Sequence, residues 1–392
     1  MLTSSTTASP QATQFARLGS VYYLVHFLSA GAYMPFMYVY YAELGISGQQ
    51  IGWVSVLSPL LMLLLATPIA ALADRRRWRV RILQGALAGL AATLFALSLP
   101  RTFGWIAALM LLMAVVSSPI MSVSDSLIAR MAQRHRLNYG GMRLWGSLGY
   151  AVSALAFGAL WQWFGFQWMF VLAALFMLPV IWLAGRFEEL PASTQAGRLP
   201  VSDLFRDAGL VLLLVASFFA AISNSLAMTF GGIYARALGG GDLLIGMMIA
   251  FAATSEILTM FLSDRILRRL HGIPTLLLAY GLMAGAYLGW VLVPDPNAML
   301  AFSILKGLGY GLWNTATIRL VTERTPETRA ATAQSLLAVS MFGLAPLIAG
   351  PAGGWIHDAY NPAAVFWLGI LALGVAALSL LLASLRGKFA ST

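Results

Sequence analysis

Apolar residues run along this chain in long stretches, separated by short breaks that contain Gly, Pro or charged residues. Each stretch approaches the roughly 20 residues that an α-helix needs to cross the hydrocarbon layer of a bilayer. The pattern therefore predicts an all-α membrane protein with twelve transmembrane helices. The expected helices fall near residues 18–43, 49–73, 80–99, 103–127, 142–163, 166–184, 208–235, 242–263, 273–293, 297–320, 328–354 and 362–385.

The twelve expected helices form two similar sets of six. The sequence YAELG at 41–45 is similar to YARALG at 234–239, and Asp74-Arg75 is answered by Asp264-Arg265 about 190 residues later. Such an offset indicates an internal duplication. We expect two pseudo-symmetric six-helix bundles joined by the longest polar stretch of the chain. The predicted parts are a disordered tail (1–16), the N-terminal bundle (17–185), a cytoplasmic linker (186–207), the C-terminal bundle (208–386) and a second tail (387–392).

The composition supports a membrane protein over a soluble one. Hydrophobic residues make up 60% of the chain and charged residues only 10%, whereas about a quarter of an ordinary soluble domain is charged. A bilayer accepts helices that are apolar on every side, and a soluble core cannot absorb so much apolar surface. The start of the chain lacks the pattern of a signal peptide, so we expect none.

The positive charges set the expected orientation. The net charge is +10, but the arginines lie in short clusters between apolar runs, which argues for membrane topology and against a nucleic-acid partner. With both termini in the cytoplasm, all but four of the 24 Lys and Arg residues fall in tails and cytoplasmic loops. The exceptions are Arg101 and Arg236 outside, and Arg143 and Lys306 within helices. We expect a multi-pass protein of a bacterial-type inner membrane. We also expect a monomer.

Several chemistries are excluded or disfavoured. The chain has no cysteine, so disulfides, thiol nucleophiles and cysteine-ligated zinc are excluded. The histidines have no metal-ligand spacing, and no nucleophile or nucleotide-binding constellation appears. We therefore expect neither an enzyme nor a cofactor.

Four ionisable residues fall within predicted helices: Asp125, Arg143, Glu256 and Lys306. Ionisable groups cost several kcal/mol in the hydrocarbon layer, and each is a candidate functional residue. The two acids and two bases can neutralise one another, which suits a site for a proton or a charged solute.

Polar residues also follow one face of several predicted helices, at steps of three, four and seven. A lipid-facing surface does not need such a stripe, so these residues are candidates for lining a solute cavity. Tyr23 and Tyr41 fall off the stripe and are expected to be interfacial or lipid-facing, and His26 is either a proton relay or a packing residue. The candidates for binding are Tyr22, His26, Tyr33, Asn224, Lys306, Tyr310 and Trp313.

The segment ALADRRRWRVRI at 71–82 resembles the cytoplasmic loop signature of the major facilitator superfamily, although Ala70, Arg77 and Trp78 depart from it. A carboxylate beside guanidinium groups at a helix end can hold the cytoplasmic ends of helices together. We expect a cytoplasmic gate formed by Asp74, Arg75 and Arg79, with Asp264 and Arg265 as its counterpart. Arg76, Arg77 and Arg81 are interpreted as topology signals.

The stretches SSPIMSVSD at 117–125 and YGGMRLWGSLGY at 139–150 resemble the lactose permease and phenylpropionate permease-like group of proton symporters. The acid Asp125, an arginine eighteen residues later at Arg143, and the aromatic Tyr150 occupy matching places. The resemblance implies that Asp125 and Arg143 face each other and bind solute, with Tyr150 offering a flat surface to a ring. The alternative is that the pair only bridges two helices.

The C-terminal half departs from lactose permease, because Gly309 and Leu312 stand where that family has a histidine and a glutamate after Lys306. Asn314 stands where the phenylpropionate group often has a histidine and joins the binding candidates. Glu256 is the remaining deep acid of this half, so Glu256 and Asp125 are the candidate proton carriers. The alternative for Glu256 is a static ion pair with Lys306.

Together these features predict a proton-coupled importer of a small organic solute, with an aromatic or other organic acid favoured. A sugar, a nucleoside or a siderophore stays open as the solute. Efflux of amphipathic compounds and, from another class, a membrane enzyme or receptor are the alternatives.

Overall fold

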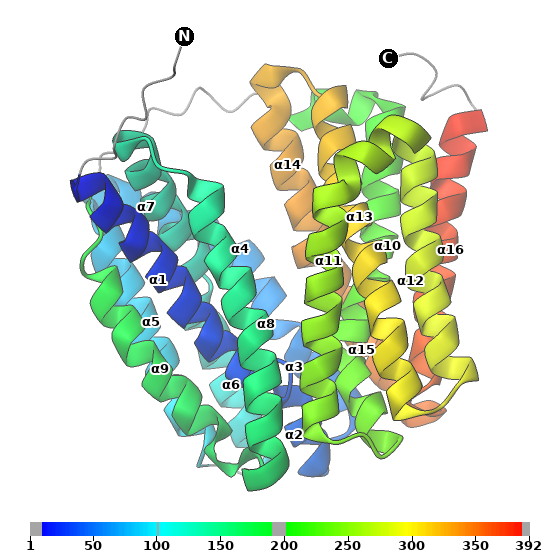
Figure 1. The fold of residues 1–392 in the computed structure, drawn as a ribbon, viewed down its shortest axis with the longest axis horizontal. Helices are drawn as coiled ribbons and strands as arrows, with labels where there is room; N and C mark the ends of the chain where they lie inside the picture. The colour runs from blue at the N-terminus through cyan, green and yellow to red at the C-terminus, as the bar shows by residue number, and fades with distance from the viewer. Residues whose placement is uncertain (1–9, 100–101, 190–200, 386–392) are drawn as a thin grey trace. The chain divides into compact units, whose positions relative to one another are not determined.

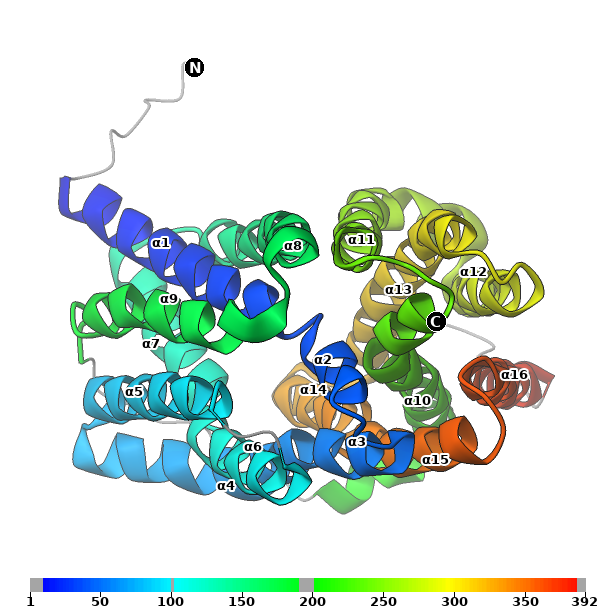
Figure 2. The same ribbon diagram turned by 90° about the horizontal axis from the view of Figure 1, so that it is seen from below.

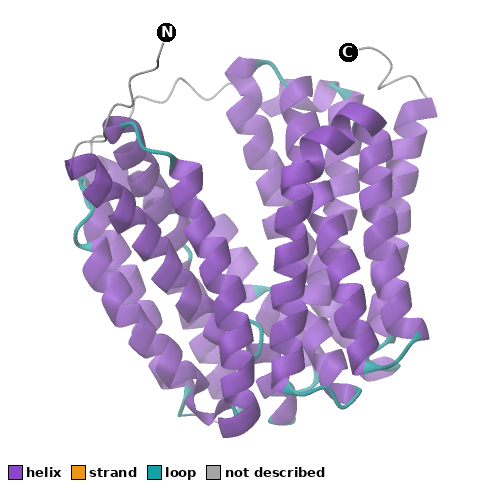
Figure 3. Cartoon of the chain, in the orientation of Figure 1, coloured by secondary structure: helices purple, strands orange, loops and turns teal. Residues whose placement is uncertain are grey.

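The computed structural model describes residues 10–99, 102–189 and 201–385, and these residues form helices joined by short loops, without a strand (Figure 3). The helices are labelled in Figure 1. They are α1 (Pro10–Tyr33), α2 (Met37–Glu43), α3 (Gly48–Ser55), α4 (Leu57–Arg76), α5 (Arg79–Leu97), α6 (Phe103–Ser117), α7 (Ile120–His135), α8 (Tyr139–Phe164), α9 (Met169–Ala184), α10 (Ala208–Ala237), α11 (Asp242–Leu270), α12 (Gly272–Leu292), α13 (Pro296–Arg324), α14 (Ala330–Ala338), α15 (Ala345–Ala359) and α16 (Ala364–Leu385). Short 3₁₀ helices form at η1 (Phe166–Trp168), η2 (Val201–Arg206) and η3 (Glu327–Arg329), and η4 (Val339–Leu344) is a π-helix.

Ten helical stretches in the described part of the chain are long and apolar enough to cross a membrane. The predicted class, an all-α multi-pass membrane protein, is confirmed, while the count of twelve stays a prediction. Helices α1 and α13 are not among the ten. Polar residues interrupt their apolar sequence, and both carry one of the polar stripes described above.

Several expected helices are broken where the backbone chemistry requires it. The first expected helix ends at Tyr33 and resumes as α2, because Pro35 has no N–H to donate and its ring clashes with the preceding turn. Pro119 separates α6 from α7 in the same way. A π-helical segment, Val339–Leu344, joins α14 to α15. Helix α1 begins at Pro10, within the expected tail 1–16, and proline is well suited to a first helical turn.

Contacts divide the described residues into two units. Unit 1 takes its residues from Met1–Met34, Leu64–Ala154 and Phe164–Thr194, and unit 2 from Pro35–Leu63, Leu155–Trp163 and Gln195–Thr392. The predicted halves rest on the sequence repeat and stay a prediction. The expected linker 186–207 is described only outside residues 190–200, and the expected tail 387–392 lies outside the described residues.

In unit 1, helix α9 packs against both α5 and α1, which lie side by side with it in Figures 1 and 2. Ser29 of α1 donates a 2.9 Å hydrogen bond to the carbonyl of Ala173 in α9. Beyond α9, the carboxylate of Glu189 accepts hydrogen bonds from the N–H groups of Arg79 (3.1 Å) and Val80 (2.9 Å). It thereby satisfies two donors that the first turn of α5 leaves free.

In unit 2, helix α13 packs closely against α11 and α12. Gly311 is needed there, because a Cβ at this position would lie 2.3 Å from Thr259 Oγ1 and 2.6 Å from the carbonyl oxygen of Glu256. The missing side chain brings the two helix backbones together, as small residues do in membrane helices. The position of Glu256 relative to α13 is therefore fixed by a backbone contact.

Helix α3 lies along α15 in unit 2 (Figure 2). The carboxylate of Asp358, at the end of α15, accepts 2.8 Å hydrogen bonds from the N–H groups of both Gly48 and Gln49. Ser47 Oγ accepts the N–H of Gln50. The first three N–H groups of α3 are thus satisfied, two of them by a side chain 310 and 309 residues away in the chain.

Candidate solute-binding site

The charged pair predicted in the N-terminal half is present in unit 1. Asp125 lies on α7 and Arg143 on α8, and Arg143 Nε is 3.9 Å from Asp125 Oδ1. Both side chains are about one-third exposed, at 35% for Arg143 and 36% for Asp125. The two charges therefore neutralise each other while a solute can still reach them.

Tyr23 of α1 completes this pair. Its hydroxyl donates a 2.6 Å hydrogen bond to Asp125 Oδ1 and lies 3.3 Å from the hydroxyl of Tyr139. The expectation that Tyr23 and Tyr41 face lipid or the interface is wrong, since their exposed fractions are 0% and 1%. Burial follows because a phenol ring can pack inside a bundle when its hydroxyl finds a partner.

Two aromatic rings of α1 hold the guanidinium of Arg143. Its central carbon lies 5.1 Å from the ring centroid of Tyr23 and 4.8 Å from that of Phe27, within the range of cation–π attraction. The ring of Phe27 in turn meets the ring of Tyr150 edge to face, with centroids 6.5 Å apart. Tyr23 and Phe27 are four residues apart and share a helix face, so α1 supplies one wall for the pair.

The turn between α7 and α8 sets the register of the pair. Arg136 ends α7 in the left-handed conformation, with φ of 53°. Asn138 Oδ1 then accepts the N–H of Gly141 at 3.0 Å and starts α8. Gly146 leaves room for Phe27 and Arg143, because a Cβ there would lie 2.8 Å from the Phe27 ring and 3.1 Å from Arg143 Nη1.

The atoms of the pair that remain unused define what it can bind. Tyr23 and Arg143 both approach Oδ1 of Asp125, and the hydroxyl of Tyr139 also interacts with this carboxylate. The Nη atoms of Arg143 likewise donate none within the described chain, and the faces of the guanidinium are occupied by rings. The pair therefore presents free guanidinium donors beside a carboxylate that is about one-third exposed.

Three other candidates of α1 lie buried in helix packing. The rings of Tyr22 and His26 stack with centroids 5.9 Å apart, and Tyr22 also meets Phe187 at 5.0 Å. Tyr33 is 3% exposed and lies near Phe170 of α9. The predicted stripe thus faces the interior of unit 1, and binding roles for these residues stay predictions.

The second pair of charges lies in unit 2. Glu256 on α11 and Lys306 on α13 are both half-buried and interact electrostatically. The nearest partner of the Lys306 ammonium is Met228 Sδ at 3.7 Å, and no carboxylate of a described residue lies within ion-pair distance of it. Glu256 and Lys306 are therefore coupled without being locked in a direct ion pair.

Helices α10 and α13 carry the remaining candidates. Asn224 is half-buried, with a buried Oδ1 that has no hydrogen-bond partner among the described residues. Trp313 is 1% exposed, and its Nε1 also lacks such a partner. Its ring meets Tyr310 edge to face at 5.6 Å, and Asn314 is half-buried. Unit 2 therefore contains buried polar atoms, Asn224 Oδ1 and Trp313 Nε1, that form no hydrogen bond with a described residue.

The predicted cytoplasmic gate is a cluster inside unit 1. Asp74 forms an ion pair with Arg79, whose exposed fraction is 3%, and Asp74 Oδ2 lies 3.9 Å from Arg130 Nη2 on α7. Arg75 and Arg265 are exposed, and the side chain of Asp264 lies outside the described residues. Asp74 and Arg79 tie α4, α5 and α7 together, and a gating role for the five residues stays a prediction.

The sequence profile of the MFS_1 like family matches residues 16–368. The chain belongs to the MFS_1 like family. It is a membrane transporter and not an enzyme, and the resemblance to the major facilitator superfamily is confirmed.

This MFS_1 like protein is similar to several proteins that are named as transporters. It is 29% identical to the maltose permease of Geobacillus stearothermophilus over 375 residues, covering 94% of this chain and 95% of that protein. It is 24% identical to the probable 3-phenylpropionic acid transporter of Escherichia coli over 303 residues, covering 72% and 77%. The crystal structure of the nucleoside transporter NupG superposes with a TM-score of 0.82 at 13% identity, covering 96% of this chain and all of that one. This last likeness shows the fold.

Proposed function

We propose that this protein imports a neutral, polyhydroxylated solute of the sugar class together with a proton. The observation that carries the proposal is the geometry of Asp125 and Arg143. The arginine already faces a carboxylate of the protein, at 3.9 Å, so the pair has no net charge to offer an anion. A carboxylate, which can accept several hydrogen bonds at once, lies beside free guanidinium donors and suits neighbouring hydroxyl groups, which both donate and accept.

The charge balance of unit 2 supports the same class of solute. Lys306 interacts with Glu256, so its charge is also countered by the protein. A carboxylate solute would bring a second negative charge close to Asp125 or Glu256. The relative named maltose permease, at 29% identity, agrees with a sugar.

Glu256 is our proposed proton carrier. It is the acid that α11 places in the interior of unit 2, and its interaction with Lys306 is electrostatic and not a direct ion pair. A proton can therefore reach the carboxylate without first breaking a salt bridge. Intramembrane acids of this kind commonly form proton pathways.

An organic acid is the second candidate, favoured by the relative named as a probable 3-phenylpropionic acid transporter. The aromatic rings of Tyr23, Phe27 and Tyr150 would suit an aromatic solute. For this solute, Asp125 would have to be neutral while the acid is bound, because two carboxylates repel.

Reconstituted transport decides between the two. Proteoliposomes with an inward proton gradient are given radiolabelled maltose or radiolabelled 3-phenylpropionate. We expect gradient-driven maltose uptake, lost in Asp125→Asn and Arg143→Gln and uncoupled from the gradient in Glu256→Gln. Glu323→Gln, which alters an exposed i,i+4 pair with Arg319, is the control and should transport normally. Uptake of 3-phenylpropionate alone would contradict the proposal of a neutral solute. Uptake that does not depend on the proton gradient would contradict the proposal of proton coupling.

The proposed setting is a bacterial-type inner membrane with both termini in the cytoplasm. It follows from the distribution of arginines along the sequence, and the multi-pass character of the protein agrees with it. Accessibility of single cysteines to a membrane-impermeant thiol reagent tests it, and the natural lack of cysteine makes every introduced one unique.

A further inference from the structure

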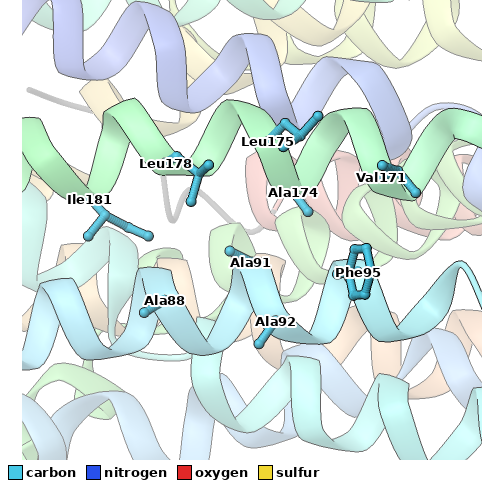
Figure 4. Close-up of a pocket in the computed structure, with 9 residues that line it drawn as sticks. All are labelled: Ala88, Ala91, Ala92, Phe95, Val171, Ala174, Leu175, Leu178 and Ile181. Carbon is cyan, nitrogen blue, oxygen red and sulfur yellow. The ribbon is translucent and has the colours of Figure 1, made fainter.

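An apolar groove of about 390 Å³ runs between α5 and α9 in unit 1. Figure 4 shows the nine residues that line it, four on α5 and five on α9. None of them is polar. The groove therefore has no group that would recognise the transported solute, and the candidate binding residues of unit 1 take no part in it.

The shape of the groove comes from an alternation of small and large residues. Ala91 and Ala174 form a nearly buried floor, with exposed fractions of 9% and 7%. Phe95, Leu175 and Leu178 stand at the rim, each more than half exposed. A trough lined only by aliphatic and aromatic carbon, open along its side, has the character of a surface for an acyl chain.

One end of the groove is closed by a polar contact. Gln84 of α5 donates a 3.2 Å hydrogen bond to the carbonyl of Ile181 in α9, and its side chain also lies against Gly185. Beyond this contact lie Arg81, one turn earlier on α5, and Arg186, just after α9. Both are exposed.

These two arginines carry charge that the protein does not neutralise. Neither forms an ion pair with a described residue, and the same holds for Arg75, Arg76 and Arg77 at the end of α4, which are also exposed. The guanidinium of Arg186 lies 4.2 Å from the ring of Trp182. Tryptophan and arginine together are typical of the level of lipid headgroups.

Helix geometry connects the arginines to the groove. Arg81, Gln84, Ala88 and Ala91 follow one another at steps of three and four, so they share a face of α5. At 1.5 Å per residue, Arg81 lies about 10 Å along the helix from Ala88. The positive charge and the apolar trough therefore follow one another along the same face of α5.

We propose that the groove between α5 and α9 is a binding site for an anionic phospholipid, with its phosphate at Arg81 and Arg186 and an acyl chain over Ala88, Ala91 and Ala92. The positive charge of the groove's end matches a phosphate, and the apolar trough matches the chain. The lipid belongs to the leaflet that the arginine-rich end of unit 1 faces. Binding there joins α5 to α9 outside the transport site.

Native mass spectrometry of the purified full-length protein tests the site. The protein is titrated with phosphatidylglycerol and, separately, with phosphatidylcholine. We expect tighter retention of phosphatidylglycerol, reduced about tenfold in Arg81→Gln/Arg186→Gln. Ala88→Leu/Ala92→Leu, which fills the groove at two exposed positions, should reduce it as well. Arg268→Gln/Arg269→Gln removes the same charge from exposed positions on α11 and should leave binding unchanged.

Three results would overturn the site: equal retention of the two lipids, an equal loss in the α11 control, or wild-type binding by both groove variants. Glycerol-1-phosphate serves as the headgroup without a chain. Competition by this compound at the lipid's own concentration would assign the arginines to a free phosphate and reject the lipid. Thermal unfolding of each variant in detergent checks that it is folded, and the exposed positions make this the expected outcome.

Discussion

The hydroxyl of Tyr23 donates a 2.6 Å hydrogen bond to the carboxylate of Asp125, across 102 residues of sequence. The same ring lies against the guanidinium of Arg143. One side chain of α1 therefore touches both members of the charged pair. It occupies Oδ1 of Asp125, while the carboxylate stays about one-third exposed to a solute.

Tyr23→Phe removes this hydrogen bond and keeps the ring against Arg143. A hydrogen bond to a charged group is worth about 1.5–3 kcal/mol, so we expect the half-saturation constant for maltose uptake to rise at least tenfold. The maximal rate should change less. Tyr280→Phe is the matched control, because the buried hydroxyl of Tyr280 has no partner among the described residues. Equal effects of the two changes would contradict a specific role for Tyr23.

Asp74→Asn leaves the buried guanidinium of Arg79 without its charged partner. Breaking a buried ion pair costs about 3–5 kcal/mol, and the partial exposure of Asp74 should place the loss at the lower end. We expect a clear fall in the melting temperature of the purified protein. Adding Arg79→Met should restore part of it, since the uncompensated charge is then gone. A double variant less stable than Asp74→Asn would contradict this account.

Gly311→Ala places a Cβ 2.3 Å from Thr259 Oγ1 and 2.6 Å from a backbone carbonyl. Helices α11 and α13 must then move apart, at a cost of about 1–3 kcal/mol for an overpacked core. Gly281→Ala on α12 is the control, because nothing lies within 4 Å of its Cβ position. We expect thermal unfolding to shift downward for the first variant only. Transport should also fall, since the contact positions Glu256.

Asp358→Ala removes the acceptor for two N–H groups at the start of α3. Loss of a helix cap costs about 0.5–2 kcal/mol. Because this cap joins α3 to α15, we expect faster hydrogen exchange across both helices. In Asp295→Ala, a cap that serves only its own helix α13 is lost, and exchange should rise locally. Uniform protection of α15 in the Asp358 variant would argue against the cap as a link between the helices.

The sequence predicts the class of the fold well, because apolar length alone determines which segments can enter a bilayer. Broken helices are harder to foresee. Pro35 and Pro119 mark two of the breaks in the sequence, although a count of apolar runs does not take them into account. The π-helical segment at Val339–Leu344 contains no comparable marker.

The candidate site is predictable in part. The eighteen-residue spacing of Asp125 and Arg143 led to a pair that the structure places at 3.9 Å. Tyr23 was missed because it lies one position beside the polar stripe that contains Tyr22. Tyr23 and Phe27 lie four residues apart, and this spacing predicts that their rings share one helix face. That the two rings contact Arg143 depends on how α1 packs against α7 and α8, which no local sequence pattern encodes.

Unit 2 includes residues from two segments that precede its main body in the chain. Asp358 accepts hydrogen bonds from the N–H groups of Gly48 and Gln49, and Glu43 lies 2.9 Å from Arg236. In each contact, one partner precedes the linker region 186–207 in the chain and the other follows it. A gene divided between residues 186 and 207 would encode one fragment holding α3 and another holding α15. Produced alone, the second fragment would lack these contacts and should be degraded, whereas co-expression of both fragments should restore a stable complex without a covalent join.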